Sequence, residues 1–293
     1  MIILILSDSI ISKSKGVAMN NELGETIKNT RTSQHLSQKE LSQDICSQPM
    51  LSSIEHGKYM PNAKLLILLC ERLNISIAEI SLSTNYHISN NQELNNQLST
   101  LCNNHHYQQL LDFLNNDDTL DLINSDLQTQ AYYYYLGIAQ IQTGADHNKV
   151  LNSFKLSLSS HENSTDSNTL TRLTHAAIAV IKSIIHQPNS VDKEIMLATN
   201  KIETINYTEN LNIIPYLSAC AAAKSSNWTI AAHWINFGIT FTTAHNSHYM
   251  LANYYFLLAH VSEATDEQNI KIEYEQRSQI FADLFNEKVF KQF

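Results

Sequence analysis

The sequence predicts an all-α protein of two domains, a small five-helix helix-turn-helix domain followed by an α-solenoid of about five helix pairs. Apolar residues recur at helical spacing almost throughout the 293 residues, and strand-like alternation is rare. Only six glycines and four prolines are present, which disfavours the many tight turns of a β-sandwich or barrel. In the larger part of the chain, helix starts recur roughly every 35 to 45 residues, as in a helical repeat.

Residues 1–19 precede both predicted domains. The apolar run Ile2–Leu6 is too short for a signal-peptide core, and no basic residue precedes it. The codons of Lys15–Val17 can form a purine-rich ribosome-binding site just upstream of Met19. We therefore expect translation to begin at Met19 and residues 1–18 to be dispensable or disordered, within an N-terminal extension of residues 1–19.

Residues 20–82 carry the signals of a helix-turn-helix domain. Ser37 and Glu40 form a capping-box pattern, Ser47 is a second N-cap, Pro49 suits a first helical turn, and Gly57 suits a C-cap. The expected helices are 21–32, 37–45, 48–56, 62–73 and 76–81.

Residues 83–90 are expected to be a linker, and residues 91–293 a repeat domain. The expected helix pairs are 91–103 with 105–115, 126–143 with 147–159, 168–186 with 191–204, 209–224 with 227–245, and 247–263 with 266–288. The segment "YYYYLGIAQIQTGADHNKVLNSFKLSL" (132–158) resembles a tetratricopeptide repeat, with a Leu-Gly and a later Phe. The alternative is a generic helical bundle, but regular pairing with short loops favours a solenoid.

The net charge of −9 is unevenly distributed along the chain. Residues 20–81 hold six basic and seven acidic side chains, whereas residues 82–293 hold eleven basic and twenty acidic ones. A strongly acidic surface repels nucleic acid. Any DNA binding must therefore use locally placed cations of the near-neutral N-terminal part.

The stretch "LSQKELSQDICSQPMLSSIEHGKYMP" (36–61) predicts two helices joined by a short turn, with Leu41, Ile45, Leu51 and Ile54 facing inward. The outward positions carry glutamine and serine rather than charge. A helix in the major groove reads bases with uncharged amides and hydroxyls near its N-terminal end, and glutamine can pair bidentately with adenine. The polar residues therefore indicate a recognition helix.

This stretch, with "NAKLLILLCERLNIS" after it, resembles the XRE-type DNA-binding domain of phage repressors related to Cro. The turn "DICSQ" departs from that pattern, because it is one residue short and lacks the usual glycine. It is similar to the turn of PlcR/Rgg-type regulators of Gram-positive bacteria, which couple such a domain to tetratricopeptide-like repeats that bind a small secreted peptide. The resemblance covers residues 20–81 by motif and 91–293 only by architecture. It implies that residues 91–293 form a repeat domain for peptide sensing and dimerisation.

The resemblance implies a set of DNA-contacting residues. These are Gln38 on a phosphate, Gln48, Pro49, Ser52 and Ser53 in the major groove, and Lys58 and Tyr59 on the DNA backbone. Pro49 stands where relatives often carry a polar reader, so its contact is expected to be apolar, for example with a thymine methyl. Glu55 is expected to be a structural acid that bonds backbone or a nearby cation. The alternative for each DNA-contacting residue is a solvated surface side chain.

The concave face of an α-solenoid is lined by the first helix of each pair and can bind an extended peptide through amides and rings. The candidate peptide-binding residues are Tyr134, Arg172, His175, Asn212, Tyr216, Tyr249 and Asn253. Arg172 is the candidate for the peptide carboxylate. The alternative for each is ordinary helix surface.

The sequence contains few features of a metal site or an enzyme active site. His245 and His248 have i, i+3 spacing and His105 is adjacent to His106, but no HExxH or Cys/His metal set accompanies them. No phosphate-binding lysine loop or nucleophile elbow is present. We expect no metal, no cofactor and no enzymatic activity.

Together these features predict a cytoplasmic, homodimeric transcription regulator of the quorum-sensing kind, with duplex DNA and a short secreted peptide as partners. The scattered cysteines suit a reducing cytosol. The sequence contains no run of about 20 apolar residues that could span a bilayer, so we expect no membrane partner. One alternative is a regulator tuned by a protein partner. Another is a repeat adaptor or phosphatase-like signalling protein that works through protein contacts alone, which the near-neutral N-terminal domain leaves open.

Overall fold

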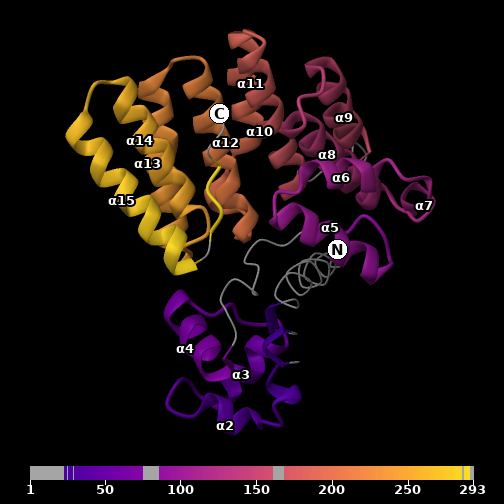
Figure 1. Cartoon of the computed structure of the whole chain (residues 1–293), viewed down its shortest axis with the longest axis vertical. Coiled ribbons are helices and arrows are strands. Elements are labelled where there is room, and N and C mark those ends of the chain that lie inside the picture. The colour runs from indigo at the N-terminus through magenta and orange to yellow at the C-terminus, as the bar shows by residue number, and fades with distance from the viewer. Residues whose placement is uncertain are drawn as a thin grey trace, which may run out of the picture.

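The computed structural model describes residues 23–24, 26–28, 30–74, 86–160, 168–285 and 287–290 (Figure 1). Within these residues every regular element is a helix, which confirms the predicted fold class. The expected extension 1–19 and the expected helix 76–81 lie outside the described residues.

The N-terminal helices, called the head from here on, surround one apolar core. They are the helical residues between 23 and 33, then α2 (Gln38–Ser42), α3 (Gln48–Glu55) and α4 (Ala63–Leu73). The core contains Leu23, Ile27, Leu41, Leu51, Ile54, Leu66, Leu69 and Leu73. Ser37 forms the predicted capping box with Glu40, and Ser47 accepts a hydrogen bond from the Met50 amide. The predicted starts of α2 and α3 are therefore confirmed.

The turn between α2 and α3 is made without glycine. Asp44 takes a left-handed conformation, with φ of 61°, and the amides of Ile45 and Cys46 both donate to the Ser42 carbonyl. Aspartate tolerates this region better than most residues. The helix predicted to reach residue 45 therefore ends at Ser42.

The repeat domain contains the five predicted helix pairs. They are α5 (Gln92–Asn103) with α6 (Tyr107–Leu114), α8 (Asp126–Gln142) with α9 (His147–Ser159), α10 (Thr169–Ile184) with α11 (Pro188–Thr199), α12 (Ile213–Lys224) with α13 (Trp228–Ala244), and α14 (Leu251–Ala264) with α15 (Gln268–Phe285). The pairs follow one another across Figure 1 from α5 to α15. A short helix α7 (Asp117–Leu120) and two 3₁₀ turns, η2 (Ile202–Thr204) and η3 (Glu209–Asn212), were not predicted.

The first helix of each pair ends in the same way. The residues after these helices, His105, Gly144, His186, Ser226 and Asp266, all have left-handed φ values between 54° and 76°. The next amide then donates back to a carbonyl five residues earlier, as from His106 to Leu101 at 2.9 Å. This is the Schellman ending, which is usually made with glycine. Only one of the five positions is glycine, so the repeat forms its turns despite a glycine-poor sequence.

Two predicted helix ends move for the same local reason. The helix predicted over 191–204 ends at Thr199 because Lys201 is left-handed, with φ of 53°. The helix predicted from 247 begins at Leu251 because Met250 is left-handed, with φ of 78°. Neither position carries the glycine or proline that would have signalled the break.

The linker prediction is only partly within the described residues. Residues 86–90 have no regular secondary structure, yet they pack onto the repeat domain. Ile88 is fully buried and its amide donates to Asn95 Oδ1, while the Tyr86 amide donates to the Tyr135 hydroxyl at 2.7 Å. This part of the predicted linker therefore begins the repeat domain.

Close helix packing depends on two glycines. A Cβ on Gly137 would lie 2.5 Å from the Phe154 ring, and a Cβ on Gly238 would lie 2.2 Å from the Tyr254 ring. The Gly137–Phe154 contact joins α8 to α9, as the repeat-like segment 132–158 implied. Tyr254 cannot swing away easily, because its hydroxyl donates to the Asn212 carbonyl at 2.6 Å.

We predict that Gly238→Ala destabilises the repeat domain by about 1–3 kcal/mol, because the new methyl group overlaps a ring that is held in place. Urea unfolding followed by tryptophan fluorescence measures this, since both tryptophans lie in α13. Asn236→Ala, an exposed change on the same helix, is the control and should stay within about 0.5 kcal/mol of the parent. Equal stability of the two variants would contradict the packing argument.

Candidate functional site

A buried ion pair holds the centre of the head. Arg31 Nε donates to Glu55 Oε1 at 2.6 Å and Arg31 Nη2 to Glu55 Oε2 at 3.0 Å, and the third guanidinium nitrogen donates to the Leu36 carbonyl at 2.7 Å. Burial works to raise the pKa of Glu55, but hydrogen bonds from Arg31 and Gln38 hold it below its usual value. Glu55 is therefore the predicted structural acid, and its cation is Arg31.

The ion pair fixes the orientation of two glutamine amides. Gln38 Nε2 donates to Glu55 Oε2 at 2.7 Å, which turns Gln38 Oε1 outward, where it accepts from Gln48 Nε2 at 2.8 Å. An ionised carboxylate only accepts hydrogen bonds, so neither amide can flip without losing its partner. Gln48 keeps its carbonyl oxygen and one N–H for a ligand, which are the two groups that pair with adenine.

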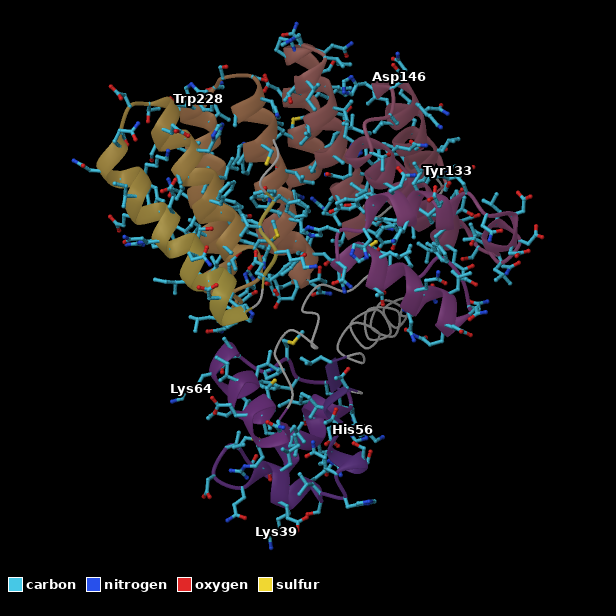
Figure 2. All side chains as sticks on the ribbon, viewed as in Figure 1. Lys39, His56, Lys64, Tyr133, Asp146 and Trp228 are labelled. Carbon is cyan, nitrogen blue, oxygen red and sulfur yellow. The ribbon has the colours of Figure 1, made fainter. Side chains whose placement is uncertain are left out.

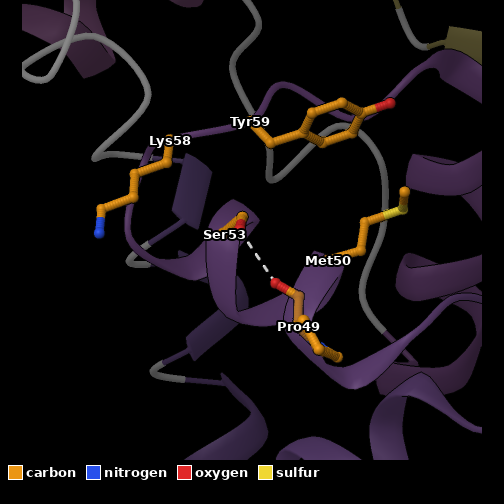
Figure 3. Close-up of a pocket in the computed structure, with 5 residues that line it drawn as sticks. All are labelled: Pro49, Met50, Ser53, Lys58 and Tyr59. Carbon is orange, nitrogen blue, oxygen red and sulfur yellow. Dashed lines mark hydrogen bonds between the residues drawn. The ribbon is translucent and has the colours of Figure 1, made fainter.

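The exposed front of α3 is shallow and mostly apolar. Figure 3 shows a depression lined by Pro49, Met50, Ser53, Lys58 and Tyr59. The Ser53 hydroxyl is tied to the Pro49 carbonyl at 2.9 Å, and Lys58 projects on the side of Ser53 away from Met50. The depression thus presents methylene, thioether and ring surface beside one cation.

Met50 is a site residue that the sequence analysis missed. Its side chain is 36 % exposed in the first turn of α3, beside exposed Gln48 and Pro49. The sequence analysis did not single it out, because methionine is an apolar residue that commonly fills core space. The signal that could have identified it is the next residue, Leu51, which fills the inward position of the first turn of α3.

Ser52 contributes less to this face. Its hydroxyl lies 3.4 Å from His56 Nδ1, and His56 Nδ1 is also 2.6 Å from the Ser52 carbonyl. The serine and histidine therefore bond to each other at the C-terminal end of α3.

Cations are spread around the head rather than gathered on one patch. Figure 2 shows Lys39 at its far end, with Lys64 and His56 on other parts of its surface. Lys58 is exposed just after α3, while Arg72 reaches the Glu40 carbonyl at 3.2 Å. A spread of single charges gives weak non-specific attraction to DNA, so affinity must come from specific contacts or from a second head.

The second candidate region is the inner cluster, formed by Tyr134, Asn212, Tyr216, Tyr249 and Asn253. Asn212 Nδ2 lies 3.3 Å from the Tyr249 carbonyl, and the Asn212 carbonyl accepts from Tyr254, whose ring meets Tyr216 edge-on at 5.9 Å. Burial raises the pKa of Tyr134, and the nearby hydroxyls of Tyr86 and Tyr249 raise it further. Five of the seven predicted peptide-binding residues therefore belong to one region.

Arg172 and His175 are placed elsewhere, at the packing between α10 and α11. Arg172 Nη1 donates to the carbonyls of Ala198 and Asn200 at 3.0 and 2.6 Å, and His175 Nδ1 lies 2.6 Å from Glu194 Oε2. These partners close the C-terminal end of α11 and hold the helix pair together. The placement favours a structural role for both residues over a contact with a peptide carboxylate.

A buried acid adjoins the inner cluster. Glu209 Oε2 accepts from the Tyr207 hydroxyl at 3.1 Å, from Asn212 Nδ2 at 3.3 Å, and from the Ser247 hydroxyl. Burial raises the pKa of Glu209 to about 7, although the Ser247 and Tyr207 hydroxyls act to lower it. The acid therefore changes its charge near neutral pH.

The two histidines with i, i+3 spacing, His245 and His248, have aromatic partners. His245 stacks on Tyr207 at 4.0 Å, and His248 stacks on Phe285 at 3.5 Å, where burial lowers the His248 pKa to about 4. Across the described part of the chain, no group of three or more His, Cys, Asp or Glu side chains is placed to hold a metal ion. No described helix is both long enough and apolar enough to cross a bilayer.

Comparison with known proteins supports the two-part reading. Residues 27–80 match the helix-turn-helix family, so the head is a helix-turn-helix domain. The crystal structure of Bacillus thuringiensis PlcR in complex with the peptide PapR7 and DNA is similar, with 19 % identity, a TM-score of 0.57, and coverage of 91 % of this chain and 96 % of that one. The apo form of the same protein gives 17 % identity, a TM-score of 0.53 and coverage of 91 % and 95 %. The chain therefore shares the PlcR fold across both domains, while no curated protein matches its sequence.

We predict that Glu55→Gln destabilises the head by about 3–5 kcal/mol, because it leaves the Arg31 guanidinium buried without a counter-charge. Hydrogen exchange of amides within residues 37–73, read by mass spectrometry, reports the head separately from the tryptophan-containing repeat domain. Glu71→Gln, an exposed change on α4, is the control and should exchange like the parent. Unchanged protection in Glu55→Gln would show that the ion pair is not needed.

We predict that the stability of the repeat domain, relative to Glu209→Gln, falls as pH rises from about 4.5 to above 7. The folded-state pKa of Glu209 is raised, so its stabilising effect is complete below the unfolded-state pKa and is lost as pH passes through about 7. The difference should reach on the order of 3 kcal/mol. Urea unfolding by tryptophan fluorescence at pH 5 and pH 8 measures it. Glu203→Gln, an exposed change nearby, is the control, and a pH-independent difference for Glu209→Gln would refute the prediction.

Proposed function

We propose that the chain is a sequence-specific DNA-binding transcription regulator whose repeat domain senses a short signalling peptide. The observation that carries this proposal is the ordered series Arg31–Glu55–Gln38–Gln48, which presents one oriented amide on the exposed front of a helix-turn-helix. A solvated glutamine on an ordinary surface has no need of an anchor that reaches a buried ion pair. Fixed donors and acceptors at a groove-facing position are what base readout requires.

In this proposal Gln48 pairs with a base, and Pro49 and Met50 contact a neighbouring apolar group such as a thymine methyl. Ser53 lies beside them, and Lys58 and Tyr59 contact the DNA backbone. Gln38 acts mainly by holding Gln48, with a phosphate contact from its free edge. Ser52 is the least favoured member of the predicted set, because it is bonded to His56.

The peptide-sensing part of the proposal rests on the inner cluster. Its buried amides can bond a peptide backbone whatever the peptide sequence, and its rings can hold apolar side chains. The PlcR structure that shares this fold contains a peptide and DNA together, which supports the same pairing of partners here. The location would be the cytoplasm, and no catalytic chemistry is proposed.

We also propose that the regulator is a homodimer. One head with scattered cations offers too little affinity for a specific site at cellular salt, and two heads can read half-sites about one helical turn apart. Among the aromatic residues of the last helix pair, Tyr254 is fully buried and Tyr255 stacks on Phe281 within the pair, which leaves less aromatic surface for a partner. The exposed aliphatic residues of α15, Ile272, Ile280 and Leu284, are the better candidates.

We predict that Gln48→Ala weakens binding to the best operator by about 1–3 kcal/mol, with little effect on random duplex DNA. Lys58→Ala should weaken binding to all sequences and flatten the salt dependence, because a phosphate contact is lost. The operator is first selected from random duplexes by the parent protein, and affinities are then measured by fluorescence anisotropy.

The matched controls are Gln268→Ala and Lys193→Ala, both exposed on the repeat domain, which should bind like the parent. If Gln48→Ala equals the parent on the selected operator, direct readout by Gln48 is wrong. If no operator can be selected at all, the adaptor alternative replaces the regulator.

A further inference from the structure

Residues 287–290 return into the repeat domain after α15. After α15 ends at Phe285, residues 287–290 have no regular secondary structure, and Figure 1 shows them running back from the end of α15 toward the middle of the helix pairs. This tail, defined as residues 287–290, meets residues from the first, fourth and fifth helix pairs. It therefore lies against the inner side of the repeat and not on its outer surface.

One amide of the inner cluster binds the tail in the manner of a peptide receptor. Asn253 Nδ2 donates to Glu287 Oε1 at 2.6 Å and to the Lys288 carbonyl at 3.3 Å, while Asn253 Oδ1 accepts from the Phe290 amide at 2.9 Å. The amide thus uses both its donor and its acceptor on backbone groups two residues apart. Asn253 is 1 % exposed, so its position is set by the fold and not by solvent.

The Phe290 side chain of the tail packs against aromatic rings of other helix pairs. Phe290 stacks on His105 at 4.5 Å and lies 6.4 Å from the Tyr216 ring, and it packs in the same apolar cluster as Tyr254. Lys288 Nζ lies 3.1 Å from Asn104 Oδ1 on the turn before α6. The tail thereby joins the first helix pair to α12 and α14.

The tail also places a carboxylate at the start of α14. Burial raises the pKa of Glu287 to about 7, and the amides of Asn253, Ala252 and Met250 act in the opposite direction. Glu287 Oε2 nevertheless makes no hydrogen bond of ordinary geometry with any described residue. The hydrogen bond that holds this carboxylate is therefore the one from Asn253 to Oε1.

We infer that residues 287–290 are an internal ligand of the inner cluster, an extended segment that occupies the place of the signalling peptide and must leave before that peptide binds. The inference rests on the proposed peptide sensing. It defines the ligand class as a short extended peptide that presents an acid or carboxylate to the start of α14 and an aromatic ring to His105 and Tyr216. The tail is thus an autoinhibitory contact.

The test uses the full chain and a synthetic peptide of sequence EKVFKQF, which is that of residues 287–293. Calorimetry measures peptide binding to the parent, to Phe290→Ala, and to Gln276→Ala as a control. Gln276 is exposed on α15. Phe290→Ala should bind the peptide at least about tenfold more tightly than the parent, because a mostly occupied site lowers apparent affinity by its free fraction.

Adding Asn253→Ala to Phe290→Ala should abolish that binding, which separates a vacated site from general loosening. If Phe290→Ala does not fold, Glu287→Gln takes its place, because it changes one carboxylate oxygen to an NH₂ that faces the amides of α14. Equal peptide affinity in the parent and the folded tail variant overturns the inference, as does binding that survives Asn253→Ala. The assay contains no DNA, so its result can be interpreted even if the protein fails to bind an operator.

Discussion

The ion pair between Arg31 and Glu55 is the interaction on which the geometry of the head depends. It ties the first helix to the last turn of α3, and the guanidinium also reaches the Leu36 carbonyl just before α2. A buried carboxylate needs all its oxygens satisfied, so it recruits Gln38, and Gln38 in turn orients Gln48. The direction of an exposed amide is thus decided by a charge in the interior, and the apolar core around it supplies the rigid frame.

Buried amides have a comparable part in the repeat domain, although Asn212 Oδ1 has no hydrogen-bond partner among the described residues. Asn212 and Asn253 are 0 and 1 % exposed, and each bonds to a segment far away in sequence. Buried amides and tyrosine hydroxyls on the inner side of the repeat make directional hydrogen bonds there. Such a surface suits a peptide backbone better than it suits a small molecule.

The features predicted correctly from the sequence are those that local rules control. Helix starts came from N-caps, and the identity of Glu55 as a structural acid came from the head motif. The features that the sequence did not indicate have physical causes. Left-handed Lys201 and Met250 broke helices without a glycine signal, and the helical period of α10 gave no sign that Arg172 would turn to the carbonyls of α11. The tail could not be predicted at all, because its partners lie 34 or more residues away and its short segment has no period.

The attachment of the tail to α15 sets a threshold for any competing molecule. A segment joined to its own receptor by a few residues acts at an effective concentration on the order of millimolar, however dilute the protein is. A diffusing peptide present at nanomolar or micromolar levels must therefore bind far more tightly than the tail does. Substitutions at Glu287 or Phe290 would shift the dose at which a population of cells responds, with no change in the receptor surface or in the DNA sequence that is read.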